Sequence, residues 1–203
     1  MLGWMSLICI YQVMMKRAAV LLAEGFEEGE SLFTVDILRR CGVGCDSVSI
    51  GDEKVTGCNS ITAVADRVLG NSDLSEYDMV VLPGGMPGAK NLKEDPRVIS
   101  IVQSFMKEGK YVAAICAAPM VLAEAGVSKG RRLTSYPADK YRDLFKDAEY
   151  VDDEIVVQDG NLITSRGPAT VLPFAYKLAE VLGGDADTVK KRMLYPDVIA
   201  WEK

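Results

Sequence analysis

Five cysteines and a complete lack of histidine limit the chemistry open to this chain. The cysteines are Cys9, Cys41, Cys45, Cys58 and Cys116. Their odd number and scattered spacing argue against a disulfide framework, and no two of them form the C-x-x-C pair typical of zinc sites and thiol oxidoreductases. Without histidine, Cys-His and Ser-His-Asp catalysis within one chain is excluded, and the commonest transition-metal ligand is missing.

Cys116 is the cysteine best placed to react. It lies between an apolar run at 111–115, which predicts a buried strand, and a predicted helix at 119–125. Its neighbours are small, as a sharp strand-to-helix bend requires: Ala114, Ala117 and Ala118. Such a bend resembles a nucleophile elbow with sulfur in place of hydroxyl, and it lies at the sheet edge where open α/β sheets bind ligands. The helix N-terminus predicts a lowered thiol pKa. The alternative is a cysteine that serves as a small core residue.

Acidic residues and a glycine pair could complete a site with this thiol. Gly84 and Gly85 follow a predicted strand and could offer backbone N–H groups to an oxyanion, or simply form a turn. Four acids cluster after the first strand: Glu24, Glu27, Glu28 and Glu30. Most would only complement a helix N-terminus. If the first strand lies beside the cysteine strand, one buried carboxyl could reach the sulfur and move a proton. Spacing alone does not select which one.

Two further side chains end predicted strands, and we expect the first of these strands to end at the same sheet edge. Arg166, within the sequence Thr-Ser-Arg-Gly-Pro at 164–168, could hold a carboxylate, bind across a subunit boundary or remain solvated. Tyr136 could line a pocket or serve as a packed aromatic.

Apolar runs alternate with helical patterns along the chain, which is typical of an α/β fold with a mainly parallel sheet covered on both faces. The predicted strands are residues 17–23, 45–50, 79–82 and 111–115, a hairpin formed by 155–158 and 162–165, and a short extra strand at 61–65. The predicted helices are residues 28–41, 96–108, 119–125, 169–182 and 186–193. We therefore expect one α/β domain over 16–203.

Length and charge narrow the possible partners. The chain has 203 residues, a net charge of −6 and no long basic run, so nucleic acid is not an expected partner. Residues 1–15 are apolar, lack the basic start and cleavage site of a signal peptide, and are too short to span a bilayer. We interpret them as an N-terminal extension ahead of a start at Met14 or Met15; the alternative is an extra element packed on the surface. We expect a cytoplasmic protein with no membrane partner.

Five motifs in order resemble the ThiJ/PfpI family, over the whole chain from Lys16 to about Lys203. They are Lys16-Arg17-Ala18, Glu27-Glu28-Gly29-Glu30, and the segments at 80–85, 113–119 and 162–168. The similarity is greatest to the branch of the Parkinson-disease-linked protein deglycase. The resemblance implies a flavodoxin-like three-layer α/β/α sandwich and a homodimer. It makes Cys116 the elbow cysteine, selects Glu30 as the carboxyl that touches the sulfur, and puts Arg166 near the dimer boundary. The backbone of Gly84, Gly85 and Ala117 falls at the oxyanion position.

The resemblance also implies a function. Tyr136 takes the place of a histidine that the family often has in a Thr-Thr-His-Pro segment, which argues against a peptidase or amidase. The deglycase branch works chiefly through the Cys and Glu pair, and both are present here. We therefore expect a glyoxalase or deglycase acting on methylglyoxal, glyoxal or glycated protein, without glutathione, metal or cofactor. The alternative is a redox-sensing stress protein or chaperone in which Cys116 is oxidised to the sulfinate.

Overall fold

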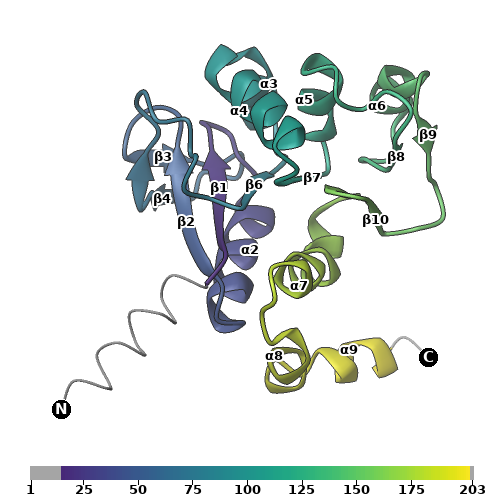
Figure 1. Ribbon diagram of the computed structural model, residues 1–203. Coiled ribbons are helices and arrows are strands. Elements are labelled where there is room, and N and C mark those ends of the chain that lie inside the picture. Colours follow the sequence, from purple (N-terminus) through teal and green to yellow (C-terminus); the bar gives the residue numbers. More distant parts are fainter. Residues whose placement is uncertain (1–14, 202–203) are drawn as a thin grey trace.

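A seven-stranded sheet forms the centre of the molecule in the computed structural model, which describes residues 15–201 (Figure 1). The prediction for the N-terminal extension lies outside the described residues apart from Met15, and so does Cys9. Across the sheet the strands are β10 (Val156–Asp159), β11 (Leu162–Ser165), β7 (Tyr111–Ile115), β6 (Met79–Leu82), β1 (Arg17–Leu22), β2 (Gly44–Ser49) and β5 (Arg67–Val68). All neighbours pair in parallel except β10 and β11, which form the predicted hairpin.

Helices cover both faces of this sheet, as predicted (Figure 1). One face carries α2 (Glu28–Arg40) and α7 (Val171–Val181), which is preceded by a 3-10 turn, η2 (Pro168–Thr170). The other face carries α3 (Gly88–Glu94), α4 (Pro96–Lys107) and α5 (Pro119–Glu124). Beyond these layers lie α6 (Asp139–Arg142) with the 3-10 turn η1 (Asp143–Phe145), and α8 (Ala186–Arg192) with α9 (Tyr195–Trp201). The architecture is a flavodoxin-like three-layer α/β/α sandwich.

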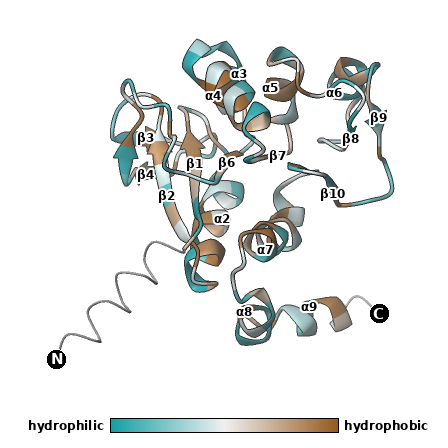
Figure 2. Ribbon diagram, viewed as in Figure 1, coloured by the Kyte–Doolittle hydropathy of each residue, from teal (hydrophilic) through white to brown (hydrophobic). Residues whose placement is uncertain are grey.

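The continuous apolar run of β1 has a direct structural cause. Successive side chains of a strand point to opposite faces, so both faces must be covered if every residue is apolar. Val20 packs in the core with Leu38 of α2 and Phe174 of α7. Its neighbour Leu21 packs in the opposite core with Phe105 of α4. Figure 2 shows hydrophobic colouring on β1 and on turns of α5 and α7.

Two small ribbons lie outside the main sheet. The predicted extra strand at 61–65 is β4 (Thr62–Val64), which pairs with β3 (Lys54–Thr56) rather than with the central sheet. A second ribbon joins β8 (Arg132–Leu133) to β9 (Glu149–Tyr150). The short strands β3, β5 and β9 were not predicted, because strands of two or three residues leave no periodic pattern. The strand expected before Tyr136 corresponds to β8, which pairs with β9 and not with the central sheet.

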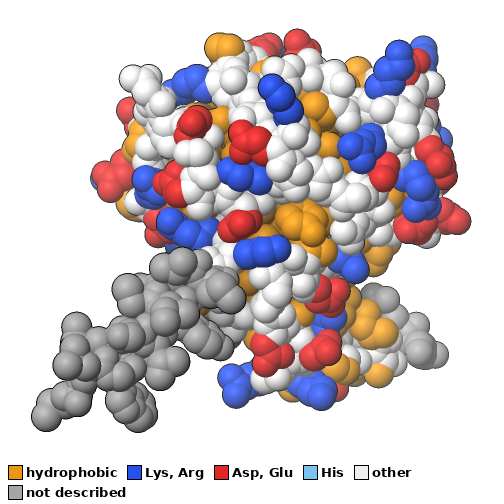
Figure 3. Space-filling view, in the orientation of Figure 1, with side chains coloured by type: hydrophobic (Ala, Val, Ile, Leu, Met, Phe, Trp, Pro, Cys, Tyr) orange, Lys and Arg blue, Asp and Glu red, His pale blue; other side chains and the backbone are white. Residues whose placement is uncertain are grey.

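The surface is mixed in charge, and the described helices are short. On the face seen in Figure 3, Lys and Arg side chains are interspersed with Asp and Glu. Within residues 15–201, no helix is both long and apolar enough to cross a membrane.

Candidate active site at the end of β7

Cys116 occupies a sharp and strained bend between β7 and α5. Its φ angle is +62°, a region that side chains other than glycine rarely adopt and that is enriched at functional sites. Neighbouring segments hold this conformation from both sides: the Cys116 N–H donates to the Ser165 carbonyl at 3.1 Å, and its carbonyl accepts from the Tyr136 N–H at 2.8 Å. The side chain is half-buried. The predicted bend is therefore present, with the thiol held at the carboxyl end of the parallel strands.

Glu30 lies beside this thiol in the first turn of α2. It is fully buried, and its Oε2 accepts a hydrogen bond from the Gly84 N–H at 2.7 Å. Among the described residues, its other oxygen, Oε1, has no hydrogen-bond partner. A Cβ added to Gly84 would lie 2.7 Å from both the Cys116 Cβ and the Glu30 Oε2. Thiol, carboxyl and glycine backbone thus meet at one point.

The route by which Glu30 reaches the sulfur differs from the predicted one. The first strand does not lie beside the cysteine strand, because β6 pairs with both β1 and β7. Gly84, just after β6, bridges the gap from this middle strand. The other three acids have separate partners: Glu24 accepts from the Thr56 N–H, Glu27 caps α2, and Glu28 accepts from the backbone and side chain of Asn59. Only Glu30 is positioned to act on Cys116.

Burial controls the titration of this pair. It raises the pKa of Glu30 to about 7, and the nearby charge of Glu27 adds to the effect, whereas the Gly84 N–H and the Cys116 thiol oppose it. Burial also raises the pKa of Cys116 to about 12, and the charge of Glu30 adds to the rise. The predicted lowering of the thiol pKa is therefore wrong in direction. The reason is that the N–H groups of Ala117 and Gly85 offset only part of these two effects.

The raised pKa of Glu30 predicts that this residue limits stability at neutral and alkaline pH. The folded state holds a proton on Glu30 up to about pH 7, whereas the unfolded chain loses it near 4.5. The contribution of Glu30 to the free energy of unfolding is therefore fully present below pH 4.5. It is lost as the pH rises through 7, which lowers the free energy of unfolding by about 3 kcal/mol. Glu30→Gln, which keeps an oxygen for the Gly84 N–H, should raise the free energy of unfolding at pH 8 and leave it unchanged near pH 4. Denaturant titrations of both proteins at the two pH values test this. A variant less stable than wild type at pH 8 would contradict it.

The absence of a side chain at Gly84 predicts a second effect. Gly84→Ala puts a methyl group 2.7 Å from Cys116 and Glu30, which is closer than real contacts allow, so the pair must separate. We expect loss of stability of about 1–3 kcal/mol and a changed rate of Cys116 alkylation. Gly51→Ala is the matched control, because nothing lies within 4 Å of its added Cβ. Equal melting temperatures and alkylation rates for the two variants would contradict the packing described.

The remaining predicted residues fall in different places. The Gly84 N–H is taken by Glu30, so its predicted oxyanion role is corrected to positioning of the carboxyl. The N–H groups of Gly85 and Ala117 remain close to the sulfur. Tyr136 reaches Cys116 through its backbone, while its exposed ring packs edge-on against Tyr141. Arg166 donates to the carbonyl of Asp152 and pairs with its carboxylate at 3.9 Å, so within this chain it holds the loop that follows β9.

Sequence reasoning missed the groups that hold the bend. Ser165 was treated only as part of a strand, yet its carbonyl accepts the Cys116 N–H because β11 pairs directly with β7. Glu28 secures the loop between β3 and β4 through Asn59, and its spacing from Asn59 carried no local signal. Within the described part of the chain, no group of three or more Cys, Asp or Glu side chains is arranged to hold a metal ion.

The fold and this site define an α/β sandwich protein with a cysteine at a strained elbow beside a buried carboxyl. The profile of the DJ-1/PfpI family matches residues 16–181, and the chain belongs to that family. Protein dj-1beta of Drosophila melanogaster is 44% identical over 172 residues, which are 84% of this chain and 91% of that protein. Its crystal structure superposes with a TM-score of 0.84 and 41% identity, covering 89% of this chain and 98% of that one.

Two other relatives widen the comparison. The Parkinson disease protein 7 homolog of Danio rerio is 37% identical over 171 residues, covering 83% of this chain and 90% of that protein. A protein of Pyrococcus horikoshii named a deglycase is 33% identical over 166 residues, covering 82% of this chain and 99% of that protein. The predicted family resemblance is confirmed.

Proposed function

We propose that this chain is a cysteine-dependent, glutathione-independent glyoxalase that also removes early glycation adducts from proteins. The observation that carries the proposal is a thiol fixed on a strained bend beside a buried carboxyl whose pKa is about 7. A general base is most effective when its pKa lies near the working pH, so Glu30 is poised to take the thiol proton at neutral pH. The deglycase named among the relatives supports the same reaction class.

The first step is addition of sulfur to the aldehyde carbon. Glu30 accepts the proton of Cys116 as the C–S bond forms, so the sulfur attacks without a free thiolate having to accumulate. The aldehyde oxygen, supported by the N–H groups of Gly85 and Ala117, takes this proton from Glu30 and gives a hemithioacetal, which leaves Glu30 ionised for the next step. This step explains why a thiol with a raised pKa can still serve as a nucleophile: the carboxyl that raises its pKa is also the group that removes its proton.

The second step is an internal oxidation and reduction. For methylglyoxal, Glu30 removes the proton from the former aldehyde carbon and delivers it to the adjacent ketone carbon, whose oxygen is also protonated. The proton that the ketone oxygen gains is the hydroxyl proton of the former aldehyde carbon, whose oxygen becomes the thioester carbonyl. One carbon is oxidised and its neighbour reduced, so no external oxidant or cofactor takes part, and the product is a thioester of lactate on Cys116. Water then breaks the C–S bond, which releases lactate and restores the thiol. Glyoxal gives glycolate by the same route.

Formation of lactate from methylglyoxal tests this proposal. Purified protein without glutathione should produce lactate in proportion to the methylglyoxal consumed, as measured by chromatography. A preformed hemithioacetal of methylglyoxal with a cysteine peptide separates the two substrate classes. Faster formation of lactate from this peptide adduct than from free methylglyoxal would favour the deglycase activity. Consumption of methylglyoxal without lactate would contradict the mechanism.

A redox sensor is a second candidate, and the unpartnered Glu30 Oε1 favours it. When Glu30 is protonated, this oxygen can donate a hydrogen bond to an oxidised sulfur. One peroxide converts the thiol to sulfenate and water, and a second gives the sulfinate. Mass spectrometry after mild peroxide treatment distinguishes the candidates: two added oxygen atoms on Cys116, with no aldehyde turnover, would favour the sensor.

Assembly and location remain part of the proposal. We propose a homodimer, supported by Leu32 and Phe33, which lie exposed on the same helix that carries Glu30. Light scattering coupled to size-exclusion chromatography measures the oligomeric state, and a monomeric mass would contradict this. The cytoplasmic location stays a prediction.

A further inference from the structure

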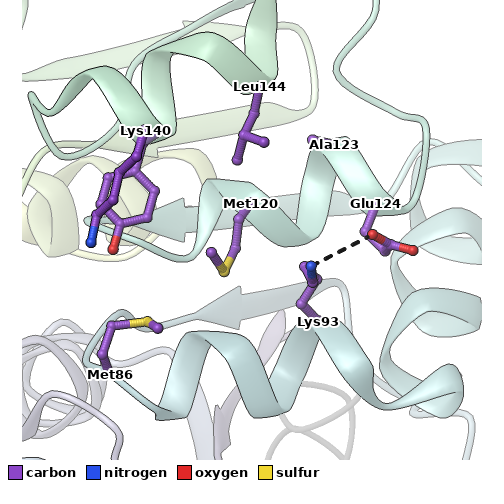
Figure 4. A pocket seen from close by; sticks show the side chains of 8 residues that line it. Met86, Lys93, Met120, Ala123, Glu124, Lys140 and Leu144 are labelled. Atoms are coloured by element: carbon purple, nitrogen blue, oxygen red, sulfur yellow. Dashed lines mark ion pairs between the residues drawn. The ribbon is translucent and has the colours of Figure 1, made fainter.

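A cavity of about 430 Å³ lies between α3, α5 and α6, and α5 is the helix that begins just after the elbow. Its volume is in the range of small-molecule sites. The site described above uses none of its lining residues. Figure 4 shows them: Met86, Lys93, Met120, Ala123, Glu124, Lys140, Tyr141 and Leu144.

Three segments connect the lining of the cavity to the residues that surround the reactive thiol. Met86 directly follows Gly85, whose N–H lies near the sulfur. The Met120 N–H donates to the Ala117 carbonyl at 3.2 Å, in the turn that Cys116 begins. The Tyr141 ring packs against the ring of Tyr136, whose N–H donates to the Cys116 carbonyl. Residues that line the cavity therefore contact, or directly follow, the residues that surround Cys116.

The lining chemistry suits an aromatic or apolar group. Met86 and Met120 point toward one another across the gap in Figure 4, and Leu144 comes down from the α6 side. Thioethers are polarizable and adapt to aromatic rings. The charged side chains of the lining have partners of their own. Lys93 pairs with Glu124 at 3.9 Å, and the Lys140 ammonium lies 4.8 Å from the centre of the Tyr141 ring. The surface formed by Met86, Met120 and Leu144 is therefore apolar.

We propose that this cavity binds the aromatic or apolar substituent of an α-oxoaldehyde whose aldehyde carbon is attacked by Cys116. The inference rests on the proposed function and names its substrate class: oxoaldehydes larger than methylglyoxal. Phenylglyoxal is the probe. It follows the same isomerisation and, with water, gives mandelate, so atoms balance without a further reactant.

The first test compares two substrates in one protein. The ratio of kcat/KM for phenylglyoxal to that for methylglyoxal should fall about ten-fold in Met86→Ala/Met120→Ala, because apolar pocket contacts are worth that much in discrimination. Met15→Ala is the matched control, since Met15 is an exposed methionine near Cys41, in a different cavity. If the double variant unfolds, Leu144→Ala takes its place as the test variant, because Leu144 is exposed. An unchanged ratio in folded variants overturns the inference.

The second test does not need turnover. Site-resolved mass spectrometry gives the rates at which N-phenylmaleimide and N-methylmaleimide alkylate Cys116, each normalised to its rate with N-acetylcysteine. The phenyl reagent should be favoured in wild type, and this preference should be lost in the double variant. If the preference is present but no lactate or mandelate forms, the cavity stands and the proposed function fails. If lactate forms but neither ratio responds to the variants, the cavity inference fails alone.

Discussion

Replacing Cys116 with alanine should lower the rate of lactate formation from methylglyoxal by roughly 10³-fold or more. In the proposed mechanism the sulfur forms the covalent bond that the later steps require, so no other group can take its part. Removal of the nucleophile leaves only weak binding of the aldehyde. The measurement is lactate produced under saturating methylglyoxal, with circular dichroism and thermal melting to show that the variant folds.

The matched control for this variant is Cys58→Ser. Cys58 is exposed and belongs to the loop between β3 and β4, so its removal changes a thiol that has no place in the mechanism. We expect wild-type lactate formation from Cys58→Ser. Activity that survives Cys116→Ala, or that is lost in Cys58→Ser, would show that the chemistry belongs to another thiol.

Replacing Glu30 with glutamine should lower kcat by about 10² to 10⁴-fold, the usual contribution of a positioned general base. The amide can still accept the Gly84 N–H through its oxygen, so the backbone geometry is kept while proton transfer is lost. The wild-type rate should rise with pH through about 7, where Glu30 ionises, and this rise should be absent in the variant. Together with the greater stability expected at pH 8, this makes Glu30 a residue that costs stability and supplies function.

Glu24→Gln is the control for the second prediction. Glu24 belongs to the same acidic cluster, but it is exposed and accepts from the Thr56 N–H instead of facing the thiol. Its kcat and pH profile should match those of wild type. If Glu24→Gln and Glu30→Gln lose activity equally, the effect reflects the charge of the cluster rather than proton transfer by Glu30.

The bend at Cys116 could be predicted from the sequence because its causes are local. A buried strand, small neighbours and a helix starting at Pro119 lie within ten residues, and the structure places β7 and α5 on each side of the elbow. The buried apolar runs of β6 and β7 were equally local, so their bounds were predicted without error.

The identity of the carboxyl could not be predicted from spacing, because it depends on the order of strands. Glu30 meets the thiol only because β6 pairs between β1 and β7 and brings Gly84 to both residues. The family resemblance supplied Glu30, whereas spacing left four acids open.

The prediction that the pKa of the Cys116 thiol is lowered was wrong for a related reason. A helix N-terminus is visible in the sequence, but the burial of Cys116 and the carboxyl set against it arise from tertiary packing. Those effects outweigh two backbone N–H groups. In the proposed mechanism the site therefore works as a coupled pair that shares one proton, and its titration belongs to both residues together.

The pH dependence of Cys116 alkylation by iodoacetamide, measured in wild type and Glu30→Gln, tests this coupling most directly. The pair should release its first proton near pH 7, so wild-type reactivity should rise there and then level off. In Glu30→Gln this rise should vanish, and reactivity should increase only above the ordinary thiol pKa, because burial remains and the proton acceptor is gone. A single inflection near the ordinary thiol pKa of about 8.5, identical in the two proteins, would contradict the account.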